Sequence, residues 1–123
     1  MSGPGSDMVS MQVRDGVVVA AVDGEIDLAN VEALEEALLD AASQGDVLVV
    51  DLTHVTYLDS AALSMIHRLW LTREPAEHDF RLVVADEAFG RRVLAITGLD
   101  AVIPVDRTVA EAEARLRGDR PPR

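Results

Sequence analysis

The side chains that could perform catalysis are few in this sequence. All imidazole chemistry would fall to three histidines, His54, His67 and His78, and none of them stands at a metal-ligand spacing. Ser64 and His67 lie three positions apart in a helical pattern, but a nucleophilic pair also needs an orienting acid and an oxyanion site. The absence of cysteine and lysine excludes thiol redox chemistry, sulfur-ligated zinc, Schiff bases and a Walker A loop. We therefore expect no enzyme activity, no cofactor and no metal site.

One segment, residues 50–63, places polar side chains where chemistry could occur. A buried strand there delivers Asp59 and Ser60 to the opening turn of a helix. A phosphate added to a hydroxyl at such a turn would meet free backbone N–H groups and the positive end of the helix dipole. From the local pattern alone a structural explanation is favoured, with Ser60 as the N-cap and Asp59 favouring the first turn. Likewise, Glu25 and Asp27 could be an acid pair or part of a solvated turn.

The elements that must position these residues begin with a hairpin. Two β-rich runs, residues 8–13 and 16–22, are separated by Arg14-Asp15-Gly16, and Asp-Gly is a strong signal for a tight turn. Polar residues and a glycine over 23–27 end the second run, which we interpret as a turn. Residues 47–50 are apolar without alternation, which is typical of a central strand buried on both faces. Further short strands are expected at 81–85 and 101–105.

Four helical patterns alternate with these strands. Their inward positions are expected to be Val31, Leu34, Leu38 and Ala41, then Leu63, Ile66 and Trp70, then Phe89, Val93 and Ile96, and finally Val109, Ala112 and Leu116. The expected N-caps are Asp27 or Asn30, then Ser60, then Asp106 or Thr108, and the expected stops are Gly45 and Gly98. The pattern predicts an α/β single domain with a mixed, mostly parallel central sheet, an antiparallel edge strand from the N-terminal hairpin, and about four helices.

Composition limits the partners. The formal net charge of −11 and the pI near 4.5 disfavour nucleic acid and anionic membranes and favour a protein partner with a basic face. The start of the chain lacks the pattern of a signal peptide, and its longest apolar run is far shorter than a membrane span, so we expect a cytoplasmic protein. We expect a flexible leader at 1–7, one domain at 8–117 and a flexible tail at 118–123.

Two motifs at a characteristic separation identify a family. Gly24-Glu25-Ile26-Asp27, the strand ending in Asp51-Leu52, and Tyr57-Leu58-Asp59-Ser60-Ala61-Ala62-Leu63 resemble the STAS domain of the bacterial anti-sigma factor antagonists. The resemblance implies a small domain that binds an anti-sigma factor and so frees a sigma factor. It also implies that this partner is a serine kinase of the histidine-kinase-like ATPase fold. Phosphorylation of a hydroxyl in the loop abolishes binding in this family.

The sequence departs from the family pattern at the phosphorylation loop. The usual order is Asp, Ser, then Ser or Thr, then Gly, and the third residue takes the phosphate. The first two are matched by Asp59 and Ser60, but Ala61 stands at the acceptor position and Ala62 replaces the glycine. The standard phosphoacceptor is therefore missing, and Ser60 is the remaining candidate.

The leading hypothesis is a regulatory protein-binding module. Its expected partner surface is formed by Glu25, Asp27, Asp59, Ser60, Ala61 and Ala62. Charge reversal at Glu35 or Glu36, on the outer face of the first helix, is expected to have little effect on partner binding. One alternative keeps the fold but makes the chain the STAS subunit of a lipid-transport ABC complex. Another is a small hydrolase using Ser60 or Ser64, which would require His54 or His67 within hydrogen-bond reach.

Overall fold

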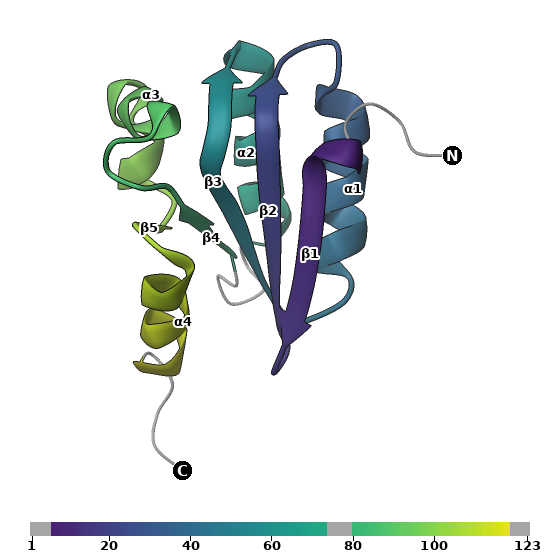
Figure 1. The fold of residues 1–123 in the computed structure, drawn as a ribbon, viewed down its shortest axis with the longest axis vertical. Coiled ribbons are helices and arrows are strands. Elements are labelled where there is room, and N and C mark those ends of the chain that lie inside the picture. Colours follow the sequence, from purple (N-terminus) through teal and green to yellow (C-terminus); the bar gives the residue numbers. More distant parts are fainter. Residues whose placement is uncertain (1–5, 74–79, 119–123) are drawn as a thin grey trace.

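Helices and strands alternate along residues 6–73 and 80–118, the part of the chain that this computed structural model describes (Figure 1). The strands are β1 (Val9–Arg14), β2 (Val17–Ile26), β3 (Val47–Leu58), β4 (Phe80–Val83) and β5 (Val105–Asp106). The helices are α1 (Val31–Ala42), α2 (Ser60–Arg73), α3 (Phe89–Thr97) and α4 (Val109–Gly118), with 3-10 turns η1 (Ser6–Met8) and η2 (Leu99–Ala101). His78, residues 1–5 of the expected leader and residues 119–123 of the expected tail lie outside the described residues.

The five strands form one sheet in sequence order, β1-β2-β3-β4-β5. The first pair is antiparallel and the three that follow are parallel, which confirms the expected mixed α/β sheet with its antiparallel edge strand. Residues 47–50 of the central strand β3 are all buried, as predicted. Successive side chains of a strand point to opposite faces of the sheet, so this burial requires cover on both sides.

Helices supply that cover. On one face, α1 and α2 pack against Leu48, Val50 and Leu52 of β3, and the expected inner residues of α1 are all buried (Figure 1). On the other face, Val47 and Val49 join Val83 and the buried Ala112 of α4 in a smaller cluster. Val109 and Leu116 pack against that cluster, which confirms the predicted inner face of the last helix. The domain therefore consists of a single sheet with buried apolar side chains packed on both of its faces.

The hairpin turn consists of Asp15 and Gly16, as the sequence predicts. Their φ angles of 53° and 80° are both positive, the pattern of the type I′ turn that matches strand twist. Gly45 has a different role from the predicted helix stop, because α1 already ends at Ala42 with Ser43 as its C-cap. A Cβ on Gly45 would lie 2.5 Å from the carbonyl oxygen of Gly16, so only glycine lets this loop approach the hairpin.

Both central strands run further than predicted. β2 continues to Ile26 through the segment that we interpreted as a turn, and β3 continues through residues 53–58. The register of the parallel pairing with β3 shifts between Ala21 and Asp23 and again between Gly24 and Glu25, so pairing continues through the polar residues. Gly24 adopts a φ of 96° there. Since β4 pairs only with Leu48–Asp51 of β3, the carboxyl ends of β2 and β3 project beyond it.

The third helix and the last strand differ from the prediction. In α3 the buried residues are Gly90 and Leu94, whereas Phe89 and Ile96 of the predicted inner stripe are exposed. Gly98 ends this helix in the left-handed conformation, as expected. Ala101 belongs to η2 rather than to a strand, and β5 is limited to Val105 and Asp106 because only they pair with β4. Within the described residues, no helix is both long and apolar enough to cross a membrane.

Candidate functional site

Asp59 joins the two loops at the carboxyl ends of β2 and β3. Its Oδ1 accepts a hydrogen bond from the backbone N–H of Ala62 at 3.0 Å, and its Oδ2 accepts one from the N–H of Leu28 at 3.1 Å. Its own N–H donates to the carbonyl of Ile26 at 3.2 Å. Asp59 therefore caps α2 and holds the β2–α1 loop at the same time.

The predicted N-cap Ser60 is instead the first residue of α2. The cap moves one position toward the N-terminus because β3 extends to Leu58, which makes Asp59 the residue between strand and helix. Ser60 is exposed, and its hydroxyl makes no hydrogen bond with another described residue. The hydroxyl is therefore free to contact a partner.

The β2–α1 loop is closed by its own side chains. Asp27 Oδ1 accepts from the N–H of Ala29 at 3.0 Å, and Asn30 Oδ1 accepts from the N–H of Asp27 at 3.0 Å. The amide of Asn30 also donates to the carbonyl of Glu25 at 2.9 Å. Asn30 is the N-cap residue of α1, one of the two predicted, but its side chain makes no cap hydrogen bond, because the side chains of Asp27 and Asn30 bond the backbone of the loop instead. The loop is thus preformed in the free protein.

Two exposed side chains outside the predicted partner surface, Leu28 and Tyr57, also lie at this edge. Leu28, at the tip of the β2–α1 loop, is 78% exposed. Tyr57, exposed near the end of β3, pairs in register with Glu25 of β2. A solitary leucine among polar loop residues was the only available signal for Leu28. We name the group formed by Leu28, Tyr57, Asp59 and Ser60 the clasp surface.

The six residues expected at the partner surface divide into three kinds. Glu25 and Ser60 are exposed, and Asp27 and Asp59 are partly buried with carboxylate oxygens bonded to backbone N–H groups. Ala61 is partly buried and packs against the core, and Ala62 is fully buried. A partner can touch Glu25 and Ser60 directly, whereas Ala62 can act only by shaping the helix.

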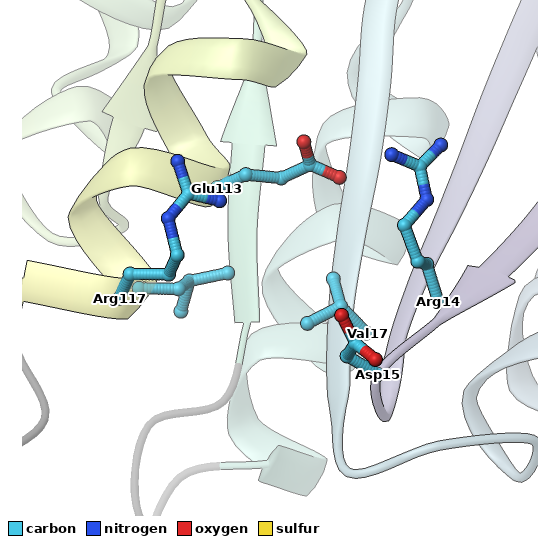
Figure 2. A pocket seen from close by; sticks show the side chains of 6 residues that line it. Arg14, Asp15, Val17, Glu113 and Arg117 are labelled. Carbon is cyan, nitrogen blue, oxygen red and sulfur yellow. The ribbon is translucent and has the colours of Figure 1, made fainter.

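The described residues do not form the serine–histidine pair that the hydrolase alternative requires. Among the described residues no hydrogen bond joins Ser60 or Ser64 to His54 or His67, and no three potential metal-ligating side chains gather at one place. A hollow of about 110 Å³ lies at the opposite end of the sheet, between the hairpin and α4 (Figure 2). It is lined by arginines, carboxylates and two aliphatic residues and is smaller than ordinary ligand pockets, which reach several hundred Å³.

Hydrogen-bond partners shift the pKa values of Arg68 and Glu111. A hydrogen bond to Glu35 raises the pKa of Arg68, and the two side chains join α1 to α2 at 2.7 Å. The pKa of Glu111 is lowered chiefly by the backbone N–H of Arg107, which donates to it at 2.8 Å. Glu35, which was expected on the outer face of the first helix, forms an ion pair with Arg68 of α2. Glu36 is exposed, as expected.

Comparison with known proteins assigns the chain to a family. A sequence model of the STAS domain matches residues 8–112. The chain belongs to the STAS domain family. It is 35% identical over 122 residues to the anti-sigma-F factor antagonist RsfB of Mycobacterium tuberculosis, and the match covers 98% of each chain.

Solved STAS structures agree with this assignment. The crystal structure of an anti-sigma factor antagonist from Mycobacterium paratuberculosis superposes with a TM-score of 0.79 at 32% identity, covering 95% of this chain and 99% of that one. The anti-sigma factor antagonist SpoIIAA in its unphosphorylated form gives a TM-score of 0.63 at 19% identity, covering 89% and 98%. At that identity the second likeness shows the fold alone. The resemblance inferred from the two sequence motifs is confirmed.

Proposed function

We propose that this STAS domain is an anti-sigma factor antagonist, which binds an anti-sigma factor in the cytoplasm and thereby frees a sigma factor. The observation that carries the proposal is the 35% identity to an anti-sigma-F factor antagonist over 98% of both chains. Residues 8–117 act as one binding module, and nothing in the proposed activity requires a catalytic group. The STAS subunit of an ABC complex remains without a specific observation in its favour.

The geometry of the clasp surface supports a binding role. Hydrogen bonds through Asp27, Asn30 and Asp59 hold the β2–α1 loop in place before any partner arrives. A loop that is already ordered loses little conformational entropy on binding. It presents Leu28, whose backbone N–H is bonded to Asp59, as an exposed apolar anchor. With a net charge of −11, the domain favours a partner that offers basic groups around this anchor.

We further propose that the partner is a serine kinase of the histidine-kinase-like ATPase fold, as the family resemblance implies. Ala61 offers no hydroxyl at the usual acceptor position. The domain would then remain unphosphorylated there and would bind its partner constitutively. Ser60 is the neighbouring hydroxyl, at the first residue of α2.

A release assay tests the proposal. The tagged protein would be used to capture its partner from the cells that express it, and mass spectrometry would identify the captured protein. The purified anti-sigma factor, loaded with its sigma factor, would then be mixed with the STAS domain. We expect release of the sigma factor at stoichiometric amounts. Failure to bind an anti-sigma factor, or binding without release, would overturn the proposed function.

A matched pair of leucine variants locates the contact. Leu28 lies in the clasp surface, and Leu39 is an exposed leucine on α1. Leu28→Ser should weaken release at least tenfold because it removes the apolar anchor, whereas Leu39→Ser should leave release within twofold of wild type. Equal effects of the two substitutions would place the interface elsewhere on the domain.

A further inference from the structure

Helix α3 leaves two apolar side chains of its predicted inner stripe exposed, whereas the third, Val93, packs against the core. Phe89 and Ile96 lie two helical turns apart on one face, and they are 44% and 77% exposed. Amphipathic helices normally turn such a stripe toward the core. In α3 the inward position is occupied by Gly90, whose backbone lies close to the core: a Cβ at that residue would be 3.4 Å from Leu58 and 3.6 Å from Val84. The close approach of the helix backbone to β3 leaves Phe89 on the outside.

The exposed ring of Phe89 lies next to the clasp surface. The ring of Phe89 lies 6.0 Å from the ring of Tyr57, measured between centroids, which is a distance typical of aromatic pairs. Tyr57 is two residues from Asp59, whose carboxylate holds Leu28. In Figure 1, α3 stands beside the same end of the sheet at which β2 and β3 end. The exposed apolar side chains therefore extend from Leu28 to α3.

A hollow of about 450 Å³ lies beside Phe89 on α3. Its charged lining residues are Asp86, Glu87, Arg91 and Arg92. Arg91 is engaged by Asp86 at 3.2 Å, whereas Arg92 is exposed and makes no ion pair within the described part of the chain. The hollow thus combines an aromatic wall with an available guanidinium.

We infer that α3 is a second contact region for the anti-sigma factor, which packs apolar side chains on Phe89 and Ile96 and pairs a carboxylate with Arg92. This inference rests on the proposed function, because the occupant is the same partner that contacts the clasp surface. Continuity of the two surfaces favours one partner across both. A second copy of the domain is a poorer occupant, since each copy carries a net charge of −11.

Isothermal titration calorimetry with the purified anti-sigma factor tests the inference. Ile96→Glu should raise the dissociation constant at least tenfold, because it puts a charge into an apolar contact. Arg92→Glu should raise it several-fold through charge repulsion. The control is Met11→Glu, because Met11 is 46% exposed on edge strand β1 and should change affinity less than twofold. The three positions are exposed, so folding is expected to persist and is checked by thermal unfolding.

The outcomes separate this inference from the proposed function. If wild type binds and Leu28→Ser weakens binding while Ile96→Glu and Arg92→Glu do not, the α3 contact is overturned and the proposed function stands. Absence of binding by wild type overturns both. Light scattering addresses the other occupant: a wild-type dimer that Ile96→Glu dissociates would assign α3 to a second copy and overturn the inference.

Discussion

The carboxylate of Asp59 accepts a hydrogen bond from the backbone N–H of Leu28, 31 residues earlier in the chain, at 3.1 Å. The same carboxylate caps α2 through the N–H of Ala62. One side chain therefore ties the position of the β2–α1 loop to the start of the helix. A change at Asp59 should alter both the stability of the domain and the presentation of Leu28.

Asp59→Ala should lower the free energy of unfolding by about 2 kcal/mol, because it removes a helix cap and leaves two backbone N–H groups without their acceptor. Asp59→Asn should cost less, since one acceptor oxygen remains. Urea denaturation measures both. Glu36→Ala, at an exposed position of α1, is the control and should change stability by less than about 0.5 kcal/mol. If Asp59→Ala lowered the free energy of unfolding no more than Glu36→Ala does, Asp59 would not be holding the β2–α1 loop and α2 together.

Much of the fold could be predicted because local patterns and tertiary packing agree. The Asp15-Gly16 turn, the buried run of β3 and the inner face of α1 each carry a strong local signal, and each is found where the sequence places it. Each of these elements depends mainly on one local property. The residue types at the turn determine the hairpin, and the pattern of apolar residues determines the strand and the helix face.

The extent of β2 and β3 could not be read from local sequence. Polar residues at 23–27 resemble a turn, yet parallel pairing carries β2 on to Ile26 with shifts in register. The longer β3 then moves the cap of α2 from Ser60 to Asp59. The pairing of β2 with β3, which are distant in sequence, therefore determines which residue caps α2.

The candidate site was partly predictable for the same reason. Asp27, Asp59 and Ser60 were selected from motifs and do meet at one edge of the sheet. Leu28 and the outward position of Phe89 were missed, because apolar residues near a helix are expected to face the core. Only the approach of Gly90 to Leu58 reverses that expectation for α3.

Asp106 and Thr108 were the two candidate caps for α4, and Thr108 is the one confirmed, because its Oγ1 accepts a hydrogen bond from the backbone N–H of Glu111 at 3.0 Å. Asp106 is instead buried in β5, where Arg81 Nε lies 2.7 Å and Arg115 Nε 2.8 Å from its carboxylate. Asp106→Asn should therefore lower the free energy of unfolding by about 3 kcal/mol, because two cations lose their counter-charge.

The matched variant for Asp106 is Arg115→Ala. The side chain of Arg115 is mostly exposed, so its removal should cost less than about 1 kcal/mol. Both variants can be measured by chemical denaturation. Similar losses for the two would mean that burial of the Asp106 carboxylate does not govern the attachment of α4.

Ser60 should affect binding more than stability. Its hydroxyl makes no hydrogen bond with another described residue, so Ser60→Ala should change the free energy of unfolding by less than about 0.5 kcal/mol. Ser60→Asp adds a charge to the exposed first turn of α2, where the helix dipole tolerates it but a fitted partner would not. We expect calorimetry to show a larger loss of affinity for Asp than for Ala. Equal affinities of the two variants would place Ser60 outside the interface.

Ala61 offers the most specific test of regulation. It is partly buried in the first turn of α2, and it occupies the position where the family pattern has a phosphoacceptor hydroxyl. With ATP and the captured anti-sigma factor, wild type should remain unmodified by intact-mass measurement. Ala61→Ser should gain one phosphate. A phosphate brings a charge of about −1.5 to −2 at neutral pH, which would repel acidic surroundings in the partner and dissociate the complex.

The double variant Ser60→Ala/Ala61→Ser assigns the modified residue, because it retains a hydroxyl only at position 61 of that pair. It should be phosphorylated as fully as Ala61→Ser alone. Rapid phosphorylation of wild type that Ser60→Ala abolishes would contradict the prediction and move the switch to Ser60. An unmodified Ala61→Ser would mean either that the partner is not such a kinase or that the buried Ala62, where the family has glycine, alters the loop. Ala61→Ser/Ala62→Gly separates these two explanations, since restored phosphorylation would show that the partner is a kinase and that the alanine had blocked access.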